Sequence, residues 1–493
     1  MNSAAATAPG TRVSEVAGGA LARMGCLDAD AIEAADSLLA RVADSEIETI
    51  RVVFPDQHGL LRGKTIVASA LRSALRSGLT APSTLLLKDT AHRTVFPVWS
   101  EDPGVSAGPM QGANDILIVP DATTFRPLPW APHSAWLLAD VRFRDGTPIP
   151  FASRSVLQRA VGALGAEGLR ATMGLEVEFY IFQQVTDGLD HAQATAPGDP
   201  VMSRGTTQGY QYLTETRYDA MEPLLDKLRR AAQGLGLPVR SVEIEFGPSQ
   251  FEMTFDPGSP MEQADNMVMF RTMVKELCAR EGYHASFMAK PKIPNLVANG
   301  WHVHQSISDA QGRNLFMPDS DGALTPQADG WLAGLLTHAT EASLLMAPTI
   351  NSYKRYQPFQ LAPNRIAWGR DNRGAMLRAL LLKGDAASRI ENRAPDSSAN
   401  PYYAFAAQLT AGLAGMQSGS KAPPGTISPY DGDAELLPTD MGAAIAAFDT
   451  SDMFRKTLGD DFVNYLVHLK RAEWSRYLGA VSDWEHAEYF NVF

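Results

Sequence analysis

One short run limits the possible fold of this chain more than any other, because two glutamates alternate inside an otherwise apolar stretch. The run is Gly174-Leu-Glu176-Val-Glu178-Phe-Tyr-Ile-Phe182. Its apolar flanks predict a buried strand, and residues two apart in a strand project from the same face. Neighbouring carboxylates repel each other unless a cation or a proton separates them. The run therefore indicates either a metal site or a strand with a solvated acidic face, and by itself it does not decide between them.

A second acidic segment extends from Ser241 to Phe255, where two strand-like runs flank a Gly-Pro turn. Glu245 and Glu252 lie on either side of this turn, so their carboxylates can converge. In the second run Phe251, Met253 and Phe255 share one face and Glu252 takes the other. An exposed polar face remains the alternative interpretation.

Two histidines follow in Asn299-Gly300-Trp301-His302-Val-His304-Gln-Ser306. In an extended segment both imidazoles lie on one side of the strand, and neutral histidine is the commonest metal ligand. A single pair of this kind is equally compatible with core or surface histidines.

Arginines are concentrated between positions 355 and 393 of a chain whose net charge is -12. Their planar guanidinium groups bind carboxylates and phosphates through paired hydrogen bonds. A solvated charge run or a subunit contact would explain some of them equally well. Glu391 lies between two of them, and we expect it on the opposite strand face if the segment is extended. The cluster comprises Arg355, Arg365, Arg370, Arg373, Arg378, Arg389 and Arg393.

Length and charge restrict the class of protein. The 493 residues predict two domains, and the net charge of -12 argues against a general nucleic-acid binder or a protein of anionic membranes. No run of about 18 apolar residues predicts a transmembrane helix. Cys26 and Cys278 lie too far apart in sequence for a disulfide framework and fit a reducing cytoplasm. The N-terminal residues do not read as a signal peptide, and we expect residues 1–30 to form a flexible tail.

Local patterns place the main elements. We predict a helix over 28–43, a strand over 48–54, a turn over 55–59 and a strand starting near Gly63. The run from Gly59 to Thr65 is not a P-loop, because only three residues separate its glycines. Proline-rich stretches at 127–132 and 148–150 indicate a domain boundary, followed by a helix over 154–167. Asn400 and Pro401 are a natural N-cap and first residue of a buried helix that ends near Met416.

Taken together and in order, these motifs resemble the glutamine synthetase family. The resemblance also rests on Asn351-Ser-Tyr-Lys-Arg355, Asn372-Arg373, Arg389-Ile-Glu-x-Arg393 and Pro395-Asp-x-x-x-Asn-Pro-Tyr402, and it extends from about residue 46 to the C-terminus. It implies an α+β fold with a small β-grasp N-terminal domain over 31–150 and a larger catalytic domain over 151–493. That domain would combine an antiparallel sheet with helices. The resemblance also implies a homo-oligomer of stacked rings, a dodecamer, with active sites between subunits.

The resemblance further implies two or more Mg²⁺ or Mn²⁺ ions, ATP and L-glutamate as ligands. One metal would be held by Glu178, Glu245 and Glu252, and the other by Glu176, His302 and Glu391. Arg355 and Arg393 would hold the amino-acid carboxylate and the transferred phosphoryl group. The nucleotide would meet His304, Ser306, Arg373, Arg378 and Arg389, while Asn299 and Gly300 would border the glutamate site. Arg373 would also act in catalysis.

Two departures from the family pattern concern the amine. Where ammonia-using members carry a glutamate in the loop after the Arg355 motif, this chain has Leu361, which cannot hold ammonium or accept its proton. The segment before His302 is two residues shorter than usual and contains Trp301. Together with Phe359 these residues predict a less polar amine pocket, and Asp89 is a candidate for the carboxylate supplied by the neighbouring subunit.

We therefore expect a ligase that joins L-glutamate to an organic amine, such as a polyamine, an alkylamine, ethanolamine or an aniline, through a γ-glutamyl phosphate. A true glutamine synthetase that uses ammonia is one alternative. A non-catalytic structural or regulatory relative is the other.

Overall fold

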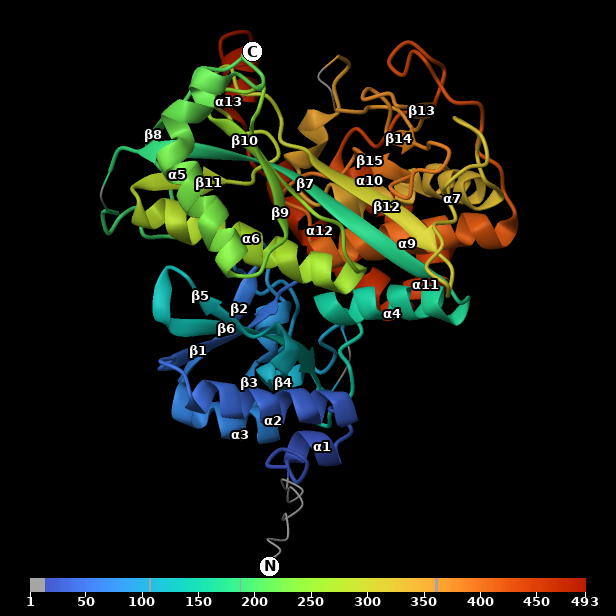
Figure 1. Ribbon diagram of the computed structural model, residues 1–493. Helices are drawn as coiled ribbons and strands as arrows, with labels where there is room; N and C mark the ends of the chain where they lie inside the picture. The colour runs from blue at the N-terminus through green and yellow to red at the C-terminus, as the bar shows by residue number, and fades with distance from the viewer. Residues whose placement is uncertain (1–13, 106–107, 187, 360–361) are drawn as a thin grey trace, which may run out of the picture. The chain divides into compact units, whose positions relative to one another are not determined.

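The computed structural model describes residues 14–105, 108–186, 188–359 and 362–493. They form two compact units (Figure 1). The smaller unit contains residues 14–54, 62–83 and 114–149, and the larger unit contains residues 55–61, 84–105, 108–113 and the described residues from 150 onward. Segments 55–61, 84–105 and 108–113 thus group with the larger unit, although the sequence placed them in the N-terminal domain.

The smaller unit contains one sheet with the strand order β2-β1-β6-β4-β3, and β5 pairs with β6. Strands β1 and β6 are parallel, whereas β6 is antiparallel to β4 and β4 to β3. This mixed sheet with its helices is the predicted β-grasp unit. Its elements are α1 (Ala20–Arg23), α2 (Ala29–Ala43), β1 (Thr49–Pro55), β2 (Leu61–Val67), α3 (Leu71–Ser77), β3 (Leu79–Pro82), β4 (Asp115–Pro120), β5 (Arg126–Leu128) and β6 (Ala131–Arg142).

Helix α2 shows how the sequence fixes these elements. Asp28 caps it by accepting a 2.8 Å hydrogen bond from the Ala31 N–H, and Leu38 and Val42 are buried. The predicted tail needs a correction. Residues 1–13 lie outside the described residues, but Leu21 of α1 is fully buried in a cluster with Leu117 and Val119, so the part from residue 14 belongs to the unit.

The larger unit is built around a nine-stranded sheet with the strand order β13-β14-β15-β12-β7-β10-β9, in which β8 and β11 also pair with β7. The long strands β7 and β12 run side by side through it (Figure 1). Its strands are β7 (Arg170–Gln184), β8 (Ser203–Arg204), β9 (Val239–Ile244), β10 (Gln250–Phe255), β11 (Tyr283–Ser286), β12 (Trp301–Ser308), β13 (Trp368–Arg370), β14 (Leu377–Leu380) and β15 (Arg389–Asn392). Its helices are α4 (Ser153–Ala166), α5 (Glu215–Gly234), α6 (Pro260–Arg280), α7 (Pro326–Thr337), α8 (Ala339–Met346), α9 (Pro401–Ser418), α10 (Met441–Asp449), α11 (Asp452–Leu458), α12 (Asp460–Leu478) and α13 (Asp483–Tyr489).

The sheet pairings are antiparallel except between β13 and β14, as the sequence predicted for the catalytic domain. One face of the sheet is apolar and packs on helices. Phe179 of β7 contacts Phe270 of α6 with ring centroids 5.7 Å apart, and Trp301 of β12 contacts Phe405 of α9 at 5.4 Å. The alternate residues of the same strands carry the charged groups on the other face.

A chain of buried amides links this apolar face to α9. Gln305 of β12 accepts from the Trp331 indole at 3.0 Å and donates to the Gln408 carbonyl at 3.0 Å. Asn392 of β15 donates to the same carbonyl at 2.9 Å. All three amides are almost fully buried, so these hydrogen bonds fix β12 and β15 relative to the helix.

Helix α9 begins as predicted. The Asn400 side chain accepts a 3.1 Å hydrogen bond from the Tyr402 N–H, Pro401 is the first helical residue, and the helix ends at Ser418. Within the described ranges, no helix is both long and apolar enough to cross a membrane.

Candidate active site

The charged face of the large sheet brings the predicted acidic and imidazole residues together. Register places Glu252 opposite Glu178, His302 opposite Glu176, and His304 opposite Glu391. Two groups of ligand atoms each lie within 4.8 Å of one another, and His302 belongs to both. One group is Glu176, His302 and Glu391, and the other is Glu178, Glu252 and His302. The first is the set expected for one metal, and the second contains His302 where Glu245 was expected.

Hydrogen-bond partners select the tautomers of the two histidines when their rings are neutral. Arg389 donates from Nε to His304 Nδ1 at 3.1 Å, so Nε2 of that ring carries the proton and donates to Glu176 at 3.0 Å. The other Glu176 oxygen lies 2.6 Å from His302 Nδ1. A proton on that nitrogen leaves the His302 Nε2 lone pair free, 3.8 Å from Glu178. A histidine oriented by a carboxylate in this way is typical of metal sites.

The carboxylates raise one another's proton affinity. Burial and the charge of Glu178 raise the pKa of Glu245 to about 8. Burial and the charges of Glu176 and Glu245 hold the pKa of Glu252 well above its ordinary value. Crowded carboxylates of this kind become ionised together only when cations neutralise them. Oxygen ligands with one imidazole suit Mg²⁺ or Mn²⁺, so the residues present fit the predicted metals.

Two of the predicted arginines close one side of this cluster. Glu391, which has no exposed side-chain surface, accepts from Arg393 at 2.5 Å and from Arg378 at 3.0 Å. The expectation that Glu391 lies on the opposite face from its neighbouring arginines is therefore wrong. Residues two apart in a strand share a face, and Arg389, Glu391 and Arg393 follow that rule. Although burial opposes the effect, the positive charge of Arg393 helps to lower the pKa of Glu391.

Arg355 reaches the cluster through a gap left by a glycine. A Cβ at Gly300 would lie 2.9 Å from His302 Nε2 and 3.3 Å from a terminal nitrogen of Arg355. Gly300 also donates its N–H to Glu178 at 2.6 Å, and buried Asn299 accepts from Gln250 at 2.9 Å. The Nε atoms of Arg355 and Arg393 are buried without a hydrogen-bond partner. Two unsatisfied guanidinium donors beside this cluster suit an anionic ligand.

Next to the carboxylates lies a cavity of about 590 Å³. Four predicted residues line it: Glu176, His304, Ser306 and Arg389. Arg240, Glu243 and Thr254 also line it, and sequence analysis did not single them out. The sequence contained a signal for Glu243, because it lies two residues from Glu245 and would share its strand face. The structure places it opposite Glu252 on the neighbouring strand.

Arg373 is the predicted nucleotide residue that lies elsewhere. It lines a separate cavity of about 670 Å³ together with Trp368, Arg370 and Lys421. Arg378 connects this cavity with the carboxylate cluster. It donates to Asp371, which lines the cavity, at 2.6 Å and to Glu391 of the cluster at 3.0 Å.

The predicted residues of the amine pocket lie in different places, and only Trp301 needs correction. Trp301 is fully buried against α9, on the opposite face of β12 from His302, so its ring lines no amine pocket. Asp89 is buried in an ion pair with Arg476 of α12 and accepts from the Arg93 N–H at 2.9 Å, and its role toward a neighbouring subunit stays a prediction. Phe359 is exposed and contacts Tyr430 with ring centroids 5.0 Å apart. Leu361 lies outside the described residues.

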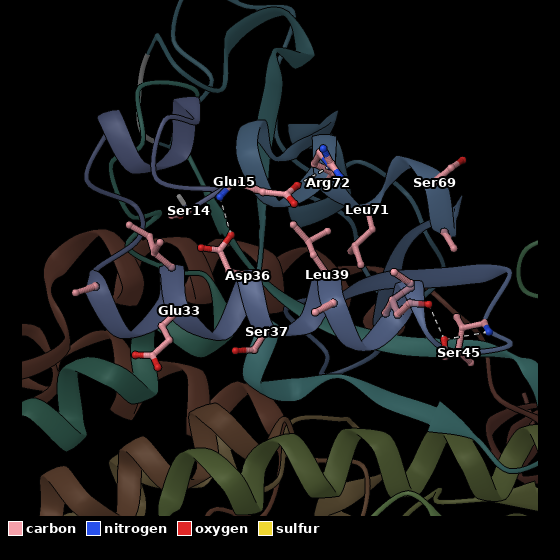
Figure 2. A pocket seen from close by; sticks show the side chains of 17 residues that line it. Ser14, Glu15, Glu33, Asp36, Ser37, Leu39, Ser45, Ser69, Leu71 and Arg72 are labelled. Carbon is pink, nitrogen blue, oxygen red and sulfur yellow. Dashed lines mark hydrogen bonds and ion pairs between the residues drawn. The ribbon is translucent and has the colours of Figure 1, made fainter. Parts of the chain in front are cut away.

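The smaller unit carries a groove of about 940 Å³ along α2 (Figure 2). Glu33, Asp36 and Leu39 line it, and Asp36 accepts from the Glu15 N–H at 3.1 Å. It contains none of the predicted catalytic or binding residues, so the charged sheet face is the better candidate site.

Comparison with known proteins identifies the family to which this chain belongs. Residues 151–489 match the catalytic domain of glutamine synthetase. The chain belongs to the glutamine synthetase family. It is an enzyme, a ligase of this family, whose catalytic domains depend on ATP and divalent metal ions.

The names of its relatives indicate different amine substrates. A γ-glutamylanilide synthase of an Acinetobacter species is 38% identical over 93% of this chain and 96% of its own length. A γ-glutamylethanolamide synthetase of Streptomyces coelicolor is 34% identical over 91% and 94%. The solved structure of a GmaS/ADP complex has a TM-score of 0.77 and 28% identity over 92% of this chain and 99% of that one. The chain therefore lies in the γ-glutamyl-amide branch that its motifs indicated.

Proposed function

We propose that this ligase joins the γ-carboxylate of L-glutamate to an organic amine. ATP would phosphorylate the carboxylate with release of ADP, and the amine nitrogen would then attack the acyl carbon and displace phosphate. The observation that carries the proposal is the combination of the intact charged site with Leu361 in place of the family's ammonium-binding glutamate. The amide-forming activities in the names of the two relatives above, and of a glutamate–isopropylamine ligase from a Pseudomonas species that is 30% identical, support the same class of acceptor.

The chain's own residues suggest a division of roles. Glu176, Glu178, Glu245, Glu252, His302 and Glu391 would hold two Mg²⁺ or Mn²⁺ ions. When bound, these ions neutralise the charge of the phosphates and of the acceptor carboxylate. Arg355 and Arg393 would bind the anionic groups with their unpaired donors, and Gly300 keeps the space open between Arg355 and His302. His304, Ser306 and Arg389 would bind the nucleotide phosphates in the adjacent cavity.

Substrate preference tests the proposal directly. ADP release would be measured with L-glutamate, ATP and Mg²⁺ or Mn²⁺ against aniline, isopropylamine, ethanolamine, a polyamine and ammonia. We expect turnover with at least one organic amine at concentrations where ammonia gives little, and the amide product should be found by mass spectrometry. Turnover with ammonia alone at low millimolar concentration would instead identify a glutamine synthetase. A chain that binds no nucleotide in the presence of either metal would be a non-catalytic relative.

We also propose that the active protein is a homo-oligomer of stacked rings, a dodecamer. The C-terminal segment supports a subunit contact, because α13 contains no buried residue and its surroundings are rich in exposed apolar side chains. Val481, Trp484, Phe490 and Val492 are each more than 60% exposed. Apolar side chains in such density are typical of interfaces.

A further inference from the structure

The hydroxyl of Tyr430 is buried and has no hydrogen-bond partner in the part of the chain that the structure describes. The rest of the side chain is half-buried, and Phe359 packs on its ring with centroids 5.0 Å apart. Buried polar groups normally bond to protein, to water or to a ligand. The acceptor for this hydroxyl must therefore come from outside the described chain.

Backbone contacts hold the Tyr430 ring in place. A Cβ at Gly374 would lie 3.0 Å from Tyr430 Cε2, so the glycine lets the ring pack closely against this turn. Asn372 of the same turn donates to the Ile427 carbonyl at 3.1 Å. Arg365 donates to the Tyr430 carbonyl at 3.4 Å. These contacts fix the direction of the hydroxyl without any help from the hydroxyl itself.

The turn that supports Tyr430 also leads to Arg393. The Arg393 N–H donates to the carbonyl of Met376, two residues after Gly374, at 2.9 Å. The guanidinium of Arg393 donates from Nη1 to Glu391, and its Nε is buried without a partner. Burial raises the pKa of the Tyr430 hydroxyl and the charge of Arg393 opposes this rise, so the two groups lie within electrostatic reach. Two donors without acceptors therefore face the same part of the site.

An anion is the acceptor that suits both donors. The guanidinium forms charge-assisted hydrogen bonds with an oxygen anion, and a phenol hydroxyl adds a further hydrogen bond without adding charge. Arg355 stands on the same side, because its Nη1 donates at 2.8 Å to the carbonyl of Ala394, which directly follows Arg393. The acidic substrate, rather than a metal ion, is therefore the partner to expect at Tyr430.

We propose that Tyr430 is a further substrate-binding residue, whose hydroxyl donates a hydrogen bond to the anionic oxygen that Arg393 holds. This oxygen belongs to the γ-carboxylate of L-glutamate before phosphoryl transfer and to the acyl phosphate after it. The inference rests on the proposed function for the identity of the acid, but it does not depend on which amine attacks.

Steady-state kinetics of Tyr430→Phe test this contact, because the variant loses the hydroxyl and keeps the ring on Phe359. ADP release would be measured with varied L-glutamate at saturating ATP, Mg²⁺ and the best amine of the unaltered enzyme. We expect kcat/KM for L-glutamate to fall roughly tenfold, as loss of one hydrogen bond to a charged group predicts. KM for ATP should change less than twofold. Tyr477→Phe, which removes an exposed hydroxyl from α12, is the control and should change neither constant.

The separate kinetic constants identify which form of the acid the hydroxyl contacts. A higher KM for L-glutamate with an unchanged kcat assigns the contact to the bound carboxylate. A lower kcat with an unchanged KM assigns it to the phosphoryl group, because an interaction made only during the reaction lowers kcat. Either result supports the inference.

Thermal stability separates substrate binding from a structural role. Because the hydroxyl has no partner in the described chain, Tyr430→Phe without ligands should have a Tm equal to or higher than that of the unaltered protein. The rise in Tm caused by L-glutamate with Mg²⁺ and ADP should be smaller in the variant. Tyr430→Leu, which also removes the ring contact with Phe359, should lower the Tm without ligands.

Three results with Tyr430→Phe would each overturn the inference: an unchanged kcat/KM for L-glutamate, a rise confined to KM for ATP, or a lower Tm without ligands. If the unaltered enzyme uses ammonia alone, the proposed function fails, whereas a tenfold loss measured with ammonia still supports the role of Tyr430. If the unaltered enzyme releases no ADP with any amine, the ligand-induced rise in Tm decides, and an equal rise in both proteins overturns the inference.

Discussion

Glu391 and Arg393, two residues apart in the chain, form a 2.5 Å ion pair in which the glutamate side chain is completely buried. Truncating it in Glu391→Ala would leave the guanidinium groups of Arg393 and Arg378 without their shared partner. We expect the free energy of unfolding to fall by about 3–5 kcal/mol, as removal of one partner of a buried pair predicts. Urea unfolding followed by tryptophan fluorescence would measure it. Glu281→Ala, which breaks the exposed pair with Lys227, should cost less than about 1 kcal/mol. Equal losses in the two variants would contradict the assigned role of the buried pair.

The raised pKa of Glu245 predicts a pH-dependent effect on stability in the absence of metal. The folded state keeps this proton up to about pH 8, whereas the unfolded state loses it near the ordinary value of 4.5. Between these values the unfolded state binds fewer protons, so Glu245 lowers stability as pH rises. In EDTA, the Tm of Glu245→Gln minus that of the unaltered protein should therefore increase from pH 5 to pH 8. Excess Mg²⁺ or Mn²⁺ should reduce this difference, and a difference that is constant with pH would refute the assignment.

Arg389 offers a test of the nucleotide cavity. Its Nε orients His304 at 3.1 Å, and its side chain lines the cavity beside Ser306. Loss of a charge-assisted contact of about 1.5–3 kcal/mol in Arg389→Ala should raise KM for ATP roughly 10- to 100-fold, with a smaller change in KM for L-glutamate. Arg230→Ala removes an arginine from an exposed pair and should leave both constants unchanged. A rise confined to KM for L-glutamate would reassign the cavity.

The buried amide chain predicts that a residue far from the charged groups supports the site. Gln408→Leu would leave the amide donors of Gln305 and Asn392 without their acceptor, at a cost of about 1–3 kcal/mol for each unsatisfied group. Urea unfolding would measure the loss. Gln417→Leu on the same helix, where the amide is exposed and bonds to Glu167, should be nearly neutral. Indistinguishable stabilities of the two variants would show that the chain contributes little.

Removal of residues 481–493 tests the proposed assembly. This deletion takes away the exposed apolar residues around α13, including Trp484 and Phe490. We expect light scattering coupled to size exclusion to report a smaller oligomer, because the apolar contact area between subunits would be lost. A particle of unchanged subunit number would show that this segment is not part of the interface.

Features that depend on neighbouring residues could be predicted from the sequence, whereas contacts between residues far apart in the chain could not. Alternation within a strand placed Glu176 with Glu178 and His302 with His304, because side-chain direction is a local property. The same rule, applied consistently, puts Trp301 on the apolar face and Glu391 with Arg393, and the two errors at these residues came from not applying it. The ion pair of Asp89 could not be predicted, because its partner Arg476 is 387 positions away.

The place of Tyr212 beside the carboxylate cluster could not be predicted from sequence for a related reason. No local pattern connects it with Glu245. Only the fold brings the two together, because the residues around Tyr212 form backbone hydrogen bonds with the residues on either side of Glu245. The helices were easier to predict from sequence. The N-caps of α2 at Asp28 and of α9 at Asn400, and the apolar pattern of each helix, lie within a few residues of one another.

Five of the six metal-binding candidates lie within paired strands, and Glu245 directly follows β9. A shift of one residue in β7 would turn both Glu176 and Glu178 toward the helices, so the register of this strand can vary little. Loop positions bear no such restriction. We therefore expect new acceptor preferences to arise by changes in the loops that border the site, while the strands that carry the proposed metal ligands are kept. Such a division would let a single scaffold diversify across many nitrogen sources.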